Sequence, residues 1–125
     1  MPEVQGQSPC AETELRRLCS ALHLDAPIVR RFIGDYLRLL QCRLDRIEHD
    51  LGSGDIPSAI VGLLSLSSSS TMLGATGVAD AAEQLRRNVS SGNIADVAEG
   101  RTLLAAQAST ARVSLARIES AGAAC

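Results

Sequence analysis

The sequence predicts an all-α protein: an antiparallel up-down four-helix bundle with an extra short N-terminal helix. Apolar residues recur every three or four positions through four long segments. Short turns that contain glycine separate these segments, and such turns make successive helices antiparallel neighbours. Phe32 and Tyr36 are the only aromatic residues. The core must therefore be aliphatic and rich in alanine, which favours helices over sheets.

The first two helices are predicted over residues 11–22 and about 26–52. Asp25 is a candidate cap for the longer one, with Pro27 in its first turn. The apolar residues of the short helix are Leu15, Leu18, Cys19 and Leu22. The core stripe of the longer helix comprises Val29, Ile33, Tyr36, Leu40, Leu44, Ile47 and Leu51.

Three further helices are predicted over about 56–74, 78–90 and 94–119. Asp55 should cap the first of them, and Gly74 should end it. Its stripe comprises Ala59, Leu63, Leu66, Ser70 and Leu73. The stripe of the next helix comprises Val78, Ala81, Ala82, Leu85 and Val89.

The last helix has a stripe that one charged residue interrupts. Arg101 falls within this stripe, and we expect its guanidinium to extend to the rim of the bundle. The apolar members are Ile94, Val97, Leu104, Ala108, Ala111, Leu115 and Ile118.

A single domain over residues 11–120 accounts for the chain, with a loose leader at 1–10 and a frayed tail at 121–125. A chain of 125 residues is long enough for one core and too short for two. Residues 56–79 are uncharged, but they contain too many serines, threonines and glycines for a bilayer span. The N-terminal residues lack the features of a signal peptide, so we expect a cytoplasmic protein with reduced thiols.

Composition excludes several classes of function. The formal net charge is −2 and the isoelectric point is about 5.6, which argues against nucleic-acid binding. The cysteines and histidines show no metal-ligand spacing, so neither a metal nor another cofactor is expected. The serine run 67–70 would need a nearby base for catalysis, but His49 should lie more than one helical turn away. We therefore expect no enzymatic activity.

Residues 63–75 resemble the motif of the histidine-containing phosphotransfer (HPt) family. That motif is Ala-His-x-Leu-Lys-Gly-Ser-x-x-x-Leu-Gly-Ala, on the third helix of a comparable bundle. The positions that match are Leu66, Ser69, Leu73, Gly74 and Ala75. The resemblance extends over about residues 25–118. It implies a signalling module of a two-component phosphorelay system, whose partners are response-regulator receiver domains and histidine kinases.

The sequence departs from the family where the chemistry resides. The phosphorylated histidine of the family falls on Leu64, its lysine on Ser67 and its glycine on Ser68. A leucine has no lone pair to accept a phosphoryl group, and a serine cannot supply the positive charge of a lysine. The resemblance therefore implies a degenerate member that binds its partner without accepting phosphate.

The partner-binding residues are predicted on one side of the third helix. We call Ile60, Leu64, Ser67, Ser68 and Thr71 the docking face. It is either partly buried against a neighbouring helix, or exposed as an apolar spot among small hydroxyls that another protein can approach. The basic residues Arg43, Arg46, Arg86 and Arg87 either form a rim that steers an acidic partner or are ordinary solvated charges.

The sequence is also compatible with two alternative functions. An active phosphorelay carrier could use His23 or His49 in place of the missing histidine. A structural adaptor could instead form a homodimer by burying its apolar face against a second copy.

Overall fold

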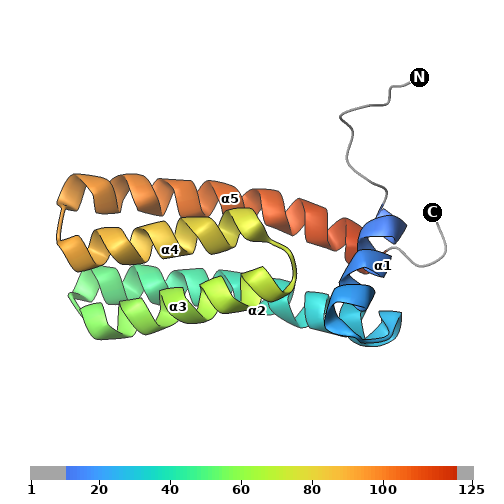
Figure 1. Cartoon of the computed structure of the whole chain (residues 1–125). Coiled ribbons are helices and arrows are strands. Elements are labelled where there is room, and N and C mark those ends of the chain that lie inside the picture. The colour runs from blue at the N-terminus through green and yellow to red at the C-terminus, as the bar shows by residue number, and fades with distance from the viewer. Residues whose placement is uncertain (1–10, 121–125) are drawn as a thin grey trace, which may run out of the picture.

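The computed structural model describes residues 11–120, and all its regular structure is helical. The five helices are α1 (Ala11–Leu22), α2 (Ala26–Ser53), α3 (Ile56–Met72), α4 (Thr76–Ser91) and α5 (Ile94–Ser120) (Figure 1). The predicted fold class is confirmed, and each predicted helix end lies within two residues of the observed one. The predictions for residues 1–10 and 121–125 lie outside the described residues.

The four long helices form an antiparallel bundle in which α3 and α5 occupy opposite corners. Both α2 and α4 pack against α3 and also against α5. Because α2 and α5 have 28 and 27 residues and α3 and α4 have only 17 and 16, the longer pair extends beyond the α3–α4 turn. At that end α1 crosses the bundle and packs against α2 and α5 (Figure 1). The outer side of α3 therefore faces away from that of α5.

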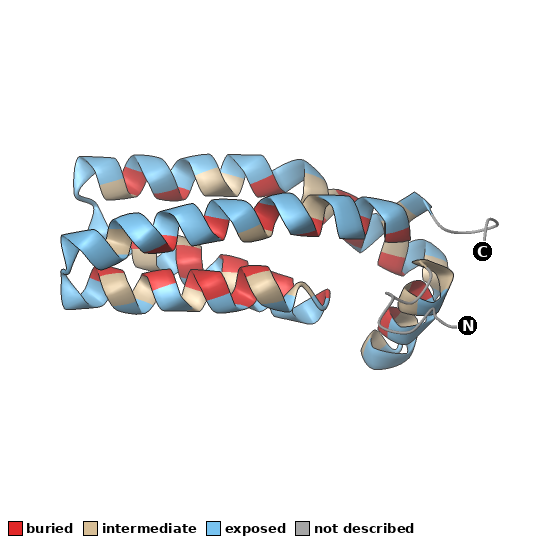
Figure 2. Cartoon of the chain, turned by 90° about the horizontal axis from the view of Figure 1, so that it is seen from above, coloured by how far each residue is buried: buried red, intermediate tan, exposed pale blue. Residues whose placement is uncertain are grey.

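The core follows the predicted stripes, which appear as bands of buried residues along each helix (Figure 2). Every predicted stripe residue of α3 and α4 is buried. In α2, Leu44 and Leu51 are half-buried and the other stripe residues are buried. The largest fully buried side chains are Ile33, Leu40, Leu63, Leu66 and Leu85.

The prediction for α5 is wrong at two positions. Ile94 is 85% exposed, because it is the first residue of the helix and lies at the end of the bundle, beyond the cover of the neighbouring helices. Gly100, not Arg101, continues the stripe and is buried against α4, where an added Cβ would lie 3.1 Å from Leu85 Cδ1. Arg101 points outward from the core and forms an ion pair with Glu48 on α2.

The turns before and after α3 each contain a glycine in the left-handed conformation, Gly54 before it and Gly74 after it. Gly54 adopts φ 81°, a left-handed conformation that glycine accommodates without strain, and its N–H donates to carbonyls at the end of α2. The Asp55 side chain then accepts a 3.3 Å hydrogen bond from the Ser58 N–H, as a cap should. Asp25 occupies the corresponding position before α2, but its side chain makes no capping hydrogen bond.

Candidate docking surface on the third helix

The docking face divides between solvent and the side of α3 that faces α4. Leu64 is 45% exposed, and Ser68 and Thr71 are exposed as well. Ile60 and Ser67 are half-buried. The adjacent leucine, Leu63, is completely buried, because one residue corresponds to a rotation of about 100° around a helix. The docking face is therefore partly buried against a neighbouring helix and partly exposed, and its centre at Leu64 is open to solvent.

The exposed apolar surface of α3 is larger than the sequence analysis predicted. Val61 is 66% exposed and Met72 is 55% exposed, and α3 contains no charged residue along its 17 positions. The predicted face omitted both residues. Their position in the sequence could have identified them, since both are apolar residues that fall outside the core stripe.

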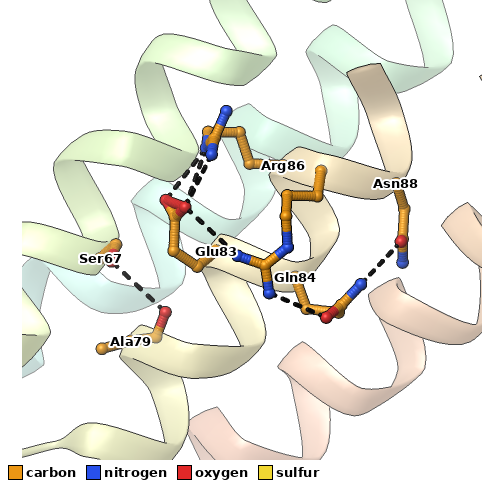
Figure 3. A network of polar contacts seen from close by, with 7 residues as sticks. Ser67, Ala79, Glu83, Gln84, Arg86 and Asn88 are labelled. Carbon is orange, nitrogen blue, oxygen red and sulfur yellow. Dashed lines mark hydrogen bonds and ion pairs between the residues drawn. The ribbon is translucent and has the colours of Figure 1, made fainter. Parts of the chain in front are cut away.

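On the α4 side, the docking face borders a set of paired charges (Figure 3). Ser67 Oγ donates a 3.4 Å hydrogen bond to the carbonyl of Ala79. Arg86 donates three hydrogen bonds of 2.8–3.1 Å to the carboxylate of Glu83, and Arg87 Nη1 lies 3.8 Å from the same carboxylate. The hydrogen bond from Arg86 lowers the pKa of Glu83, and the same bond raises the pKa of Arg86. Glu83 therefore compensates part of the predicted basic rim.

On the α2 side, the other two arginines face a groove between α2 and α3. Arg43 Nη1 donates a 3.0 Å hydrogen bond to Ser69 Oγ, and Arg46 Nε lies 3.6 Å from the carboxylate of the buried Asp50. The groove has a volume of about 570 Å³, and Leu39 and Val61 also line it. The four predicted arginines therefore lie on two flanks of α3, two of them on α2 and two on α4.

The serines of the run 67–70 form hydrogen bonds within α3 and between α3 and α2. Ser70 Oγ and Tyr36 Oη form a buried 2.6 Å hydrogen bond between α3 and α2. Burial raises the pKa of Tyr36, and the hydrogen bond with Ser70 and the charges of Arg43 and Arg112 oppose this shift. Ser69 Oγ donates to the carbonyl of Ser65 one turn earlier, a common arrangement for serine within a helix.

His49 lies too far along α2 to act on residues 67–70. Gly62 lies beside Ile47, and Ser70 bonds to Tyr36, so Ser67 is level with about residue 41 of α2. His49 is about eight residues further on, or about 12 Å along the helix axis. His49 and His23 are both exposed. His23 follows α1 and has a φ of 56°.

The comparisons with known proteins give no family, relative or structural neighbour. No protein-family model, no curated protein and no solved structure matches the chain. Within residues 11–120, no three or more histidine, cysteine or acidic side chains are grouped so that they could hold a metal ion. None of the helices in the same range is both long and apolar enough to span a bilayer.

Proposed function

We propose that this protein is an HPt-like signalling module of a two-component phosphorelay system, and that it binds a receiver domain or a histidine kinase without accepting phosphate. The observation that carries the proposal is the position of Leu64, which is 45% exposed at the centre of the uncharged outer side of α3. Binding would regulate the partner by occupying its docking surface.

The chemistry of the docking face supports binding and argues against phosphoryl transfer. Phosphoryl acceptance needs a nucleophile such as an imidazole, and Leu64 has none. The hydroxyl of Ser67 already donates to a backbone carbonyl of α4, and it carries no positive charge that could stabilise a phosphoryl group. The docking face therefore lacks both of the groups that the family uses.

The apolar residues of α3 can supply the contact energy. Leu64, Val61 and Met72 are each about half-exposed or more, and burying such side chains stabilises a complex by about 1–2 kcal/mol each. Between them, Ser65 and Ser68 are small enough to let a partner helix approach closely.

A nearby cation adds charge complementarity to this surface. Arg43 is half-buried and forms no ion pair within residues 11–120, where its hydrogen-bond partner is the neutral hydroxyl of Ser69. A carboxylate on the partner would pair with this guanidinium. Receiver domains carry an acidic phosphorylation pocket, so they fit this requirement.

The test combines a phosphoryl-transfer assay with a binding measurement. A receiver domain carrying radiolabelled phosphate is incubated with the purified protein, and the expected result is binding with no label on this chain. Leu64→Asp should weaken binding about tenfold or more, because it places a charge at the centre of the contact. Leu103→Asp on α5 is the matched control, since Leu103 is 44% exposed and should leave binding unchanged.

Two results would contradict the proposal. Label on the protein would indicate an active carrier, and its loss in His49→Ala or His23→Ala would identify the acceptor. Equal effects of Leu64→Asp and Leu103→Asp would exclude the docking face as the binding surface. In the opposite direction, Leu64→His combined with Ser67→Lys should introduce detectable phosphoryl transfer, since it replaces the two missing groups.

A further inference from the structure

A second stripe runs along the solvent-exposed side of α5, outside the core stripe. Its six members fall at helical spacings of 4, 3, 4, 3 and 4, and all of them are exposed: Glu99, Leu103, Ala106, Thr110, Val113 and Arg117. Leu103 is 44% exposed and Val113 is 56% exposed. We call this set the α5 outer stripe. A heptad-like spacing of this kind is typical of a helix face that packs against another helix.

Two copies of the α5 outer stripe that run in opposite directions place complementary residues opposite each other. Its midpoint is position 108. When a second α5 lies antiparallel across this midpoint, Glu99 faces Arg117, Leu103 faces Val113 and Ala106 faces Thr110. We propose that a second copy of this chain docks there, so that two α5 helices pack antiparallel in a symmetric dimer.

The charges at the two ends of the stripe select this partner and this orientation. Neither Glu99 nor Arg117 forms an ion pair within residues 11–120. They are 18 positions apart, or about 27 Å along the helix. In the antiparallel dimer, Glu99 of each copy lies beside Arg117 of the other, so the interface contains two such pairs. A parallel arrangement would place glutamate against glutamate and arginine against arginine, which is unfavourable.

The size of the stripe sets the strength of the dimer. A helix face about 27 Å long and about 10 Å wide covers a few hundred Å² per copy, less than the roughly 800 Å² per partner of a standard stable interface. The dimer is therefore weak and depends on concentration. Ala106 and Thr110 at its centre are small, which lets the two helices approach closely.

The dimer leaves the docking face free. Because α3 and α5 occupy opposite corners of the bundle, association through α5 leaves α3 exposed on both copies. The dimer would present two docking faces, pointing away from each other. This inference rests on α5 alone and does not depend on the proposed function of α3.

The charge arrangement allows a test by reversal. Sedimentation equilibrium of the full chain, with reductant and at low salt, is measured from about 10 µM to about 1 mM, the range expected for a small interface. Glu99→Arg and Arg117→Glu should each weaken self-association about fivefold or more, because each creates two like-charge contacts. An equimolar mixture of the two variants should associate at least as strongly as the unmodified protein, since every pair is again opposite in charge.

A second pair of variants tests the apolar centre. Leu103→Asp should abolish dimerisation, and Leu64→Asp, at a position of nearly equal exposure on α3, should leave it intact. Circular dichroism confirms that each variant is folded. A monomer at all concentrations would overturn the inference, and so would a mixture of the charge variants that associates no better than either alone. These results concern α5, so they are distinguishable from a failure of receiver binding through α3.

Discussion

The helices α3 and α5 lie at opposite corners of the same bundle, and both pack against α2, but their polar contacts with α2 differ. The contact of α3 includes a buried hydrogen bond between the neutral hydroxyls of Tyr36 and Ser70. The contact of α5 includes an exposed ion pair between Arg101 and Glu48, and Arg112 also donates to Gln41. Both helices bury apolar stripes in the core, but the α3–α2 contact includes a buried pair of neutral hydroxyls, whereas the α5–α2 contact includes an exposed ion pair.

This difference extends to the outer sides of the two helices. The outer side of α3 carries no charge at either end. It therefore has no charge pattern that would favour packing against α3 of a second copy. The outer side of α5 is neutral in the middle and carries opposite charges at its ends. On the two proposals made above, these exposed helices favour different partners: α3 a different protein and α5 another copy of this chain.

The largest effect is expected at two adjacent leucines of α3. Leu63→Ala should lower the free energy of unfolding by about 2–5 kcal/mol, because it leaves a cavity in the core at a completely buried position. Leu64→Ala should lower it by less than about 1 kcal/mol, since Leu64 already contacts solvent. Urea denaturation measures both values. Similar losses would show that the outer side of α3 is needed for folding.

A smaller effect is expected at the buried contact between α3 and α2. Tyr36→Phe should lower the free energy of unfolding by about 1 kcal/mol, because it removes the hydrogen bond to Ser70. Combining it with Ser70→Ala should cost less than the sum of the two single changes, since both remove the same bond. Additive losses in a double-mutant cycle would contradict this account of the contact.

The same tyrosine makes the fold sensitive to alkaline pH. Burial raises the pKa of Tyr36 above its ordinary value of 10.0, so folding favours the neutral phenol. This contribution to stability is fully present below about pH 10 and is lost as the pH rises, because the unfolded chain then ionises first. Tyr36→Phe should reduce the loss of stability above pH 10. An unchanged alkaline transition in the variant would exclude Tyr36 as its origin.

The smallest effect is expected where α5 meets α2 at the surface. Glu48→Gln should lower the free energy of unfolding by less than about 1 kcal/mol, because both partners of the ion pair with Arg101 are almost half-exposed. The loss should shrink further in high salt, which screens exposed charges. Thermal unfolding at low and high salt measures it. A loss larger than that of Tyr36→Phe would reverse the proposed difference between the two helices.

Helical periodicity predicted the core stripes because burial selects apolar residues at every third or fourth position. It could not predict end effects, so it placed the exposed Ile94 in the core. It also counted Arg101 within a stripe that the small Gly100 completes, because an apolar pattern does not reveal where two helices approach closely.

The candidate site was predictable in part. The exposure of Leu64 follows from its position one residue past the core stripe. The pairing of Arg86 with Glu83 follows from their spacing of three residues on one helix, but the separation of the four arginines onto two flanks of α3 depends on how the helices pack. The linear sequence does not specify this packing, so the placement of the four arginines relative to α3 required the structure.

The most direct test of the central claim is an NMR titration of the isotopically labelled protein with receiver domains. We expect amide chemical-shift changes centred on Leu64 and its neighbours on the outer side of α3, and no covalent change in this chain when the receiver is phosphorylated. Shift changes confined to other helices, or the appearance of a phosphorylated histidine, would contradict this claim.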